Sequence, residues 1–162
     1  TSDFTHLSFR GKTIYVATVM DVFGKEVVGY SVLTTHATQL VTQALLGAVH
    51  KYPIPTILHS DQGSEYTSKD YLTLLVSLGI QPSMSHKGSP WENGYQESFY
   101  DKFKIDLGDP NRFESLGELV AAIAETMYRY NNSRIHTILK MPPAIFAQRH
   151  SQRSNMILEG VS

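Results

Sequence analysis

The chain has 162 residues, of which 41% are hydrophobic and 18% charged. This length and composition fit one domain with a real hydrophobic core, and they exclude an intrinsically disordered chain. The formal net charge of -1 argues against a protein that holds nucleic acid by bulk positive charge, so any contact with DNA must depend on local patches. The absence of cysteine excludes disulfides and thiolate metal sites. No apolar run approaches the roughly 20 residues that a bilayer-spanning helix needs.

The first third of the chain has the pattern of three β-strands. Alternating and β-branched residues predict strands at Phe4–Phe9, Thr13–Met20 and Glu26–Leu33. Glycine-containing turns separate them, at Arg10–Lys12 and at Asp21–Lys25. We therefore expect an antiparallel meander at the N-terminus.

Helices and strands then alternate. The apolar spacing predicts a helix through Val41, Leu45 and Ala48, a strand at Pro53–His59, a helix at Ser68–Leu78 and a strand at Ile80–Ser85. Three helices follow: one at Trp91–Leu107, one that begins at a Ser115–Glu118 capping box, and a short one near Ala144–Arg149. The side chains expected inward are Tyr95, Phe99, Phe103 and Leu107 on the first of these helices, and Leu116, Leu119, Val120, Ile123, Met127 and Tyr130 on the second. This order predicts an α/β fold: a five-stranded mixed sheet, made of three antiparallel N-terminal strands plus two further strands, flanked by helices on both faces.

Three acidic residues lie where these elements are expected to converge. Asp3 comes just before the first strand, Asp61 directly follows the fourth, and Glu97 is on the helix after the fifth. Carboxylates from separate elements at one edge of a sheet form an oxygen-rich site that suits Mg²⁺ or Mn²⁺, and the sequence offers zinc no His-x-x-x-His pair. Taken singly, Asp61 also fits a turn cap, and Glu97 also fits the solvated side of an amphipathic helix.

The motifs around these acids resemble those of a known family. HSDQGSEYTS contains Asp61, SMSHKGSPWENGYQES ends one residue after Glu97, and 35 residues separate the two acids. SDFTH at the N-terminus and YNNSRIHTILKMPPAIF near the C-terminus follow the same order. Together these segments resemble the catalytic core of the DDE transposases of bacterial insertion sequences, the orfB type, which are related to retroviral integrases.

This resemblance implies a ribonuclease H-like fold and a DNA transposition or integration activity. Asp3, Asp61 and Glu97 would be the catalytic residues and would bind two Mg²⁺ ions, with Mn²⁺ as a substitute. The partners implied are transposon ends, target DNA and further copies of the chain, at least as a dimer, in the bacterial cytoplasm beside the nucleoid and not in a membrane. The match runs from Thr1 to about Gln148, so we expect residues 1–150 to form the catalytic core and 151–162 a C-terminal tail, flexible or not.

Five further residues are candidates for DNA contact. Asn93 and Lys104 are expected on the Glu97 face of the helix, and the resemblance assigns Lys104 to a basic position of the family. Lys87 lies in a loop rich in glycine and proline that either binds DNA or is idle. Arg134 and His136 either contact DNA or tie the last helices to the core.

The sequence also raises the roles of two side chains near Asp61 and allows two alternative activities. His59 either orients Asp61 or packs beside it, and Glu65 is expected on the surface of the loop. The same acids also suit a metal-dependent nuclease without strand transfer. A catalytically inactive core that serves only for DNA binding or dimerisation is the third reading.

Overall fold

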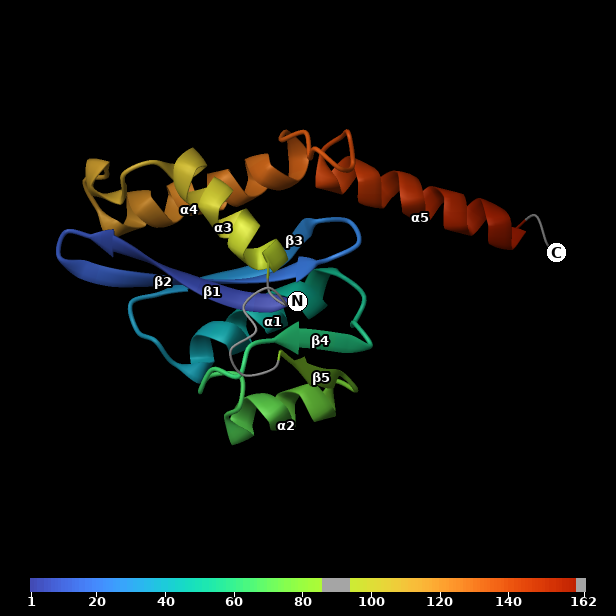
Figure 1. Cartoon of the computed structure of the whole chain (residues 1–162), viewed down its shortest axis with the longest axis horizontal. Helices are drawn as coiled ribbons and strands as arrows, with labels where there is room; N and C mark the ends of the chain where they lie inside the picture. The colour runs from blue at the N-terminus through green and yellow to red at the C-terminus, as the bar shows by residue number, and fades with distance from the viewer. Residues whose placement is uncertain (86–93, 160–162) are drawn as a thin grey trace.

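A computed structural model describes residues 1–85 and 94–159, and for 153–159 the backbone only. Five strands alternate with helices in the predicted order (Figure 1). The elements are β1 (Ser2–Phe9), β2 (Lys12–Asp21), β3 (Glu26–Leu33), α1 (Thr38–Lys51), β4 (Ile57–Ser60), α2 (Lys69–Ser77), β5 (Gln81–Met84), α3 (Gly94–Leu107), the 3-10 helix η2 (Pro110–Arg112), α4 (Leu116–Asn132) and α5 (Pro143–Glu159).

The strands form two hydrogen-bonded units instead of the single five-stranded sheet that the sequence predicted. β1, β2 and β3 form an antiparallel sheet in that order, and β4 pairs with β5 in parallel. β4 lies next to β1 without a ladder between them. Thr1 and Met20 exchange both backbone bonds, so the alternation of an antiparallel pair turns the Phe4 amide away from β2. That amide donates to Asp3 Oδ1 at 2.8 Å, and is therefore taken by a side chain instead of by β4.

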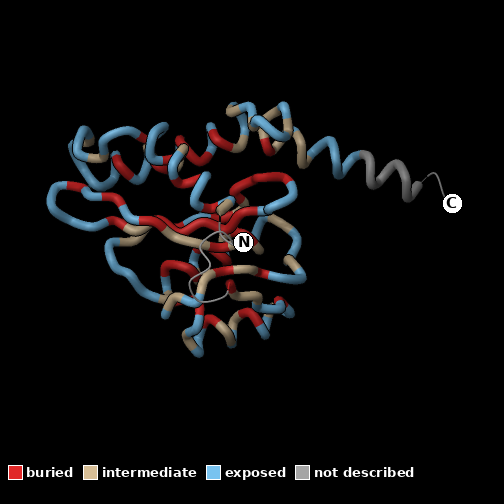
Figure 2. Tube along the Cα trace, viewed as in Figure 1, coloured by how far each residue is buried: buried red, intermediate tan, exposed pale blue. Residues whose placement is uncertain are grey.

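Helices cover both faces of the three-stranded sheet. α3 and α4 lie on one face, while α1 packs on the other (Figure 1). β4 lies beside β1, and β5 and α2 follow it. The buried positions follow the sheet and the inner sides of these helices (Figure 2). The expectation of helices on both faces is confirmed.

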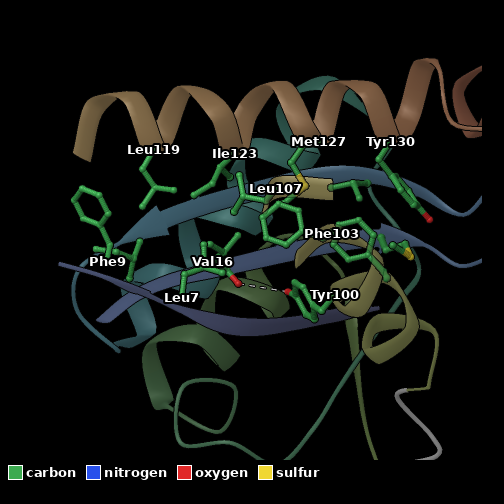
Figure 3. Close-up of a cluster of buried hydrophobic side chains, with 14 residues drawn as sticks. Leu7, Phe9, Val16, Tyr100, Phe103, Leu107, Leu119, Ile123, Met127 and Tyr130 are labelled. Carbon is green, nitrogen blue, oxygen red and sulfur yellow. Dashed lines mark hydrogen bonds between the residues drawn. The ribbon is translucent and has the colours of Figure 1, made fainter. Parts of the chain in front are cut away.

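The face under α3 and α4 holds large side chains from both helices (Figure 3). Phe99, Phe103 and Leu107 are buried as predicted. Tyr95 is not, because it is 53% exposed, and Gln96 and Tyr100 take the inner positions in its place. These residues lie on the 3.6-residue period of the helix, whereas Tyr95 lies at its edge.

Serine side chains cap the first turns of α2 and α4, but the buried side of α4 differs from the prediction at two positions. Ser68 Oγ accepts from the Tyr71 amide, and Ser115 Oγ accepts from the Glu118 amide. Leu116 and Val120 were expected inward but are exposed, because the buried stripe of α4 is centred on Leu119, Ile123, Thr126, Met127 and Tyr130.

The last helix is longer than the short helix predicted near 144–149. α5 begins at Pro143 and continues to Glu159, projecting from the body of the molecule (Figure 1). It therefore crosses position 150, and the division into a core of 1–150 and a tail of 151–162 stays a prediction. Among the described helices, none is long and apolar enough to cross a membrane.

Candidate active site

The pKa of Asp3 is raised by the place of this residue in the fold. Asp3 lies inside β1, opposite Thr18 of β2, and not before the strand as expected. Burial raises its pKa to about 7; the Phe4 amide opposes this rise, while the carboxylates of Asp61 and Glu97 add to it. Each of the two other acids is therefore close enough to act on Asp3 electrostatically.

Asp61 directly follows β4, as the sequence predicted. The Gly63 amide donates to Asp61 Oδ1 at 2.9 Å, and Gln62 Nε2 donates to the carbonyl of Ser85 at 3.1 Å. A Cβ atom on Gly63 would lie 3.0 Å from both Asp61 Oδ1 and Glu65 Oε2. The loop thus turns tightly around the Asp61 carboxylate, which caps the turn and acts electrostatically on Asp3.

Glu97 is exposed on the first turn of α3, and a buried polar network fixes this turn. Gln96, which is 0% exposed, donates from Nε2 to the Thr1 carbonyl at 3.1 Å. Thr18 Oγ1 donates to Gln96 Oε1 at 3.0 Å and lies 2.8 Å from the Tyr100 hydroxyl. That hydroxyl donates to the Asp3 carbonyl at 2.6 Å, so α3 is tied to the strand that carries Asp3.

The sequence analysis missed this network. Its signal is a glutamine and a tyrosine four residues apart on the apolar side of a helix, where polar atoms need partners. Gln96 precedes Glu97 directly, and a buried neighbour of this kind orients the exposed acid without touching the reacting atoms.

Of two other residues near Asp61, Glu65 differs from the expectation, while His59 takes one of its two predicted alternatives. Glu65 is 4% exposed, and therefore not on the loop surface; its Oε1 lies 2.9 Å from His36 Nε2. His36 lies in the connection between β3 and α1, and its contact with this loop depends on the tertiary fold, which explains the error. His59 Nδ1 lies 3.0 Å from Ser83 Oγ, its register partner on β5, and its Nε2 is buried with no hydrogen-bond partner in the described part of the chain. His59 thus packs between β4 and β5.

The carboxylates suit a hard divalent ion, but they are not gathered around one point. Within the described residues, no group of three His, Asp or Glu side chains is close enough to hold a metal ion. The donor chemistry nevertheless fits, since the mutual repulsion seen at Asp3 is what a bound cation would relieve.

The DNA-contact candidates fall into three groups. Lys87 and Asn93 lie outside the described residues. Lys104 is exposed on α3, two turns from Glu97 on the same side. Arg134 forms an ion pair with Asp106 of α3, which favours the alternative that it ties the chain after α4 to the core. His136 is half-buried and bridges to Met141.

The antiparallel order β1-β2-β3 and the parallel pair β4-β5, with helices on both faces, are the arrangement of a ribonuclease H-like α/β core. The integrase core domain model matches residues 1–90, and a second integrase core domain model matches residues 78–143. The chain belongs to the integrase core domain family.

The relatives include transposases of bacterial insertion sequences. The chain is 38% identical over 138 residues to the transposase for insertion sequence element IS904 of Lactococcus lactis, a match that covers 83% of this chain and 54% of that protein. The chain spans about half the length of such relatives. The resemblance to an insertion-sequence transposase core is confirmed.

Solved integrase structures share the fold. The simian T-cell lymphotropic virus intasome in complex with PP2A regulatory subunit B56 gamma gives a TM-score of 0.78 at 18% identity, covering 88% of this chain and 51% of that one. The HTLV-2 integrase catalytic core domain in complex with magnesium, in trimeric form, gives 0.65 at 18% identity, covering 90% and 92%. These likenesses establish the ribonuclease H-like α/β fold.

Proposed function

We propose that this chain is the catalytic core of a DDE polynucleotidyl transferase that acts in DNA transposition. The observation that carries the proposal is the electrostatic contact of Asp3 with both Asp61 and Glu97, in a chain of the integrase core family. A buried carboxylate with two acidic neighbours is costly for folding, and such arrangements are concentrated at functional sites.

The three acids are the proposed ligands of two Mg²⁺ ions, which Mn²⁺ can replace. Bound there, the ions would activate a hydroxyl nucleophile and stabilise the leaving oxygen. Support comes from the carboxylate donor set and from the related integrase core solved with magnesium. On the protein side, the Gln96 and Tyr100 network holds Glu97 beside β1, and the Gly63 amide orients Asp61.

The reactions are two in-line displacements at phosphorus. Water first attacks at the transposon end, and the phosphodiester bond breaks to release a 3′-hydroxyl. That hydroxyl then attacks a phosphodiester of target DNA, a new bond forms, and a 3′-oxygen of the target leaves. We also propose self-association, at least as a dimer, because two element ends must be joined; the cytoplasmic location beside a bacterial nucleoid stays a prediction.

The test is joining of labelled donor DNA to target DNA by the complete protein. We expect Asp61→Asn and Glu97→Gln to abolish joining, because each removes a ligand charge. The matched control is Asp101→Asn, an exposed acid one turn after Glu97 on α3, which should join DNA like the unchanged protein. Joining that survives in Asp61→Asn would overturn the proposal.

The same assay separates the alternatives. Cleavage without joining by the unchanged protein would favour a nuclease. For the inactive module, Mn²⁺ calorimetry decides: the proposal expects binding heat that Asp61→Asn loses, and no heat at millimolar Mn²⁺ would favour a domain that only binds DNA or dimerises.

A further inference from the structure

A cavity of about 470 Å³ lies on the side of α3 away from Glu97. It opens between the β2–β3 turn, the first half of α3 and the segment that follows α4, and it is lined by Lys25, Tyr95, Lys102, Tyr130 and His136. At 100° per residue, Tyr95 and Lys102 lie within 20° of each other around the helix, and about 140° or more from Glu97. The cavity is therefore separate from the three acids.

Lys25 is the residue around which this cavity is built. It is only 8% exposed and has a φ of 57°, a left-handed conformation that is uncommon outside glycine. Its Nζ lies 3.6 Å from the centroid of the Tyr95 ring. A buried ammonium group usually has a carboxylate partner, but Lys25 forms no ion pair with any described residue. The cation lines the cavity, and its partner among the described residues is the Tyr95 ring.

The remaining charges of the cavity are also positive. Lys102 Nζ donates to Ser98 Oγ at 3.1 Å and forms no ion pair in the described part of the chain, while the nearby Asp106 is paired with Arg134. Burial, then Lys102, Lys25 and Arg134, lower the pKa of His136. The imidazole therefore senses the positive charges of Lys102, Lys25 and Arg134.

We propose that this cavity binds the sugar-phosphate backbone of DNA, with Lys25 and Lys102 on a phosphate and Tyr95 against the adjoining sugar or base. The inference rests on the proposed function, since it places DNA on both flanks of α3. Cationic side chains interleaved with an exposed aromatic ring are the chemistry by which proteins track a nucleic-acid strand.

The size and place of the cavity favour DNA over a free anion. Its volume is that of a site for a molecule of several groups, well beyond one phosphate ion. An α-helix is about 10 Å across, which corresponds to roughly three nucleotides of one strand at 3.4 Å each. One duplex lying over the first turns of α3 thus reaches both the cavity and Glu97.

The first experiment measures binding of a labelled 20-base-pair duplex by fluorescence anisotropy, without divalent metal, across a range of salt concentrations. We expect Lys102→Gln and Lys25→Gln each to weaken binding about 5-fold at low salt and to reduce the salt slope by about 0.9 for the lost contact. The control is Lys12→Gln, the same charge change at the opposite end of β2. Binding by Lys102→Gln equal to that of Lys12→Gln would overturn the proposal, and because Lys102 is partly exposed, this outcome does not depend on the folding of the Lys25 variant.

The second experiment identifies the source of the phosphate by following the His136 imidazole by NMR. A bound phosphate offsets the positive field of Lys25, Lys102 and Arg134, so we expect the duplex to raise the pKa of His136, and inorganic phosphate at equal ionic strength to leave it unchanged. A rise with inorganic phosphate and none with the duplex would overturn the assignment to DNA.

The experiments distinguish an error in the cavity assignment from an error in the proposed function. The binding measurements contain no metal and no reaction, whereas the Asp61→Asn test depends on joining. If the unchanged protein joins DNA but the cavity variants bind the duplex normally, only the cavity assignment is lost. If the cavity variants lose affinity and no joining occurs, the cavity assignment stands and the chemistry does not.

Discussion

The two flanks of α3 differ in their neighbours and are held in different ways. On one flank, the Glu97 carboxylate acts on Asp3 and adds to the pKa rise there. On the other, Lys25 and Lys102 line a cavity and lower the pKa of His136. Between them lie Gln96 and Tyr100, both buried and hydrogen-bonded to the first residues of the chain.

This difference shows how one helix can keep an acid such as Glu97 from pairing with a lysine such as Lys102. If the acids and the lysines were neighbours, they would neutralise each other as ordinary ion pairs. The buried side of α3 keeps them apart, which leaves the acids available for a cation and the lysines available for an anion.

The largest expected effect breaks both flanks at once. Phe103, 2% exposed, anchors α3 on the sheet (Figure 3). Phe103→Ala should lower the free energy of unfolding by about 3–5 kcal/mol because it leaves a cavity in the core. Denaturant titration measures this, and the neighbouring exposed Lys104→Ala should change stability by less than about 0.5 kcal/mol. Equal effects of the two changes would contradict the docking of α3 described above.

The next effect concerns the acidic flank and depends on pH. The rise of the Asp3 pKa from 3.8 to about 7 corresponds to about 4 kcal/mol. A raised pKa means that the folded chain holds the proton more tightly, so the stability is fully present below pH 3.8 and is lost as the pH rises through about 7. Without divalent metal, Asp3→Asn should therefore be more stable than the unchanged chain at pH 8, by up to about 4 kcal/mol, and equally stable near pH 3.

Thermal unfolding at several pH values tests this expectation. Asp101→Asn, an exposed acid on α3, serves as the control and should show no such pH dependence of its effect. An advantage of Asp3→Asn that is the same at pH 8 and pH 3 would show that the pKa of Asp3 is not raised in the folded chain.

A smaller effect separates the positioning of Asp3 from its charge. Tyr100→Phe removes the hydroxyl that donates to the Asp3 carbonyl and contacts Thr18, at a cost of about 1–3 kcal/mol for the buried groups left without a partner. In the complete protein, we expect a lower rate of joining at saturating DNA, with duplex binding within about 2-fold. Tyr128→Phe is the matched control, since its ring is 62% exposed on α4; a stability loss of the same size there would argue against the network.

The smallest effect belongs to the basic flank. Arg134 and Asp106 are 38% and 37% exposed, so their ion pair should contribute about 0.2–1 kcal/mol in a double-mutant cycle of Arg134→Ala and Asp106→Ala. Removing Arg134 also removes a charge that lowers the pKa of His136, and that pKa should rise. A coupling energy of several kcal/mol would contradict this expectation, because it would mean that the ion pair is a major source of stability in this region.

The sequence was sufficient for the order and type of the elements, because each is short and strongly patterned. The alternation in β3, the capping box at Ser115 and the glycine turns are local features, and local features fix local structure. The three acids were singled out by their places after expected strands and by the resemblance to the transposase family, whose spacing Asp61 and Glu97 match. The sequence did not predict the break between β1 and β4, the burial of Glu65 or the length of α5, since each depends on a partner far away in the chain or on the absence of one.

The amino-acid sequence alone determined a chain of the integrase core type with three acids in the expected order. Only the tertiary structure decided that Asp3 lies within β1, where the carboxylates of Asp61 and Glu97 add to the rise of its pKa, and that Gln96 instead of Tyr95 lies beneath the helix. Only the tertiary structure brought Lys25, from a turn 77 residues away, beside Lys102. The physical reason is that a pKa or a binding cavity depends on distances across the fold, whereas periodicity and capping depend on neighbours along the chain.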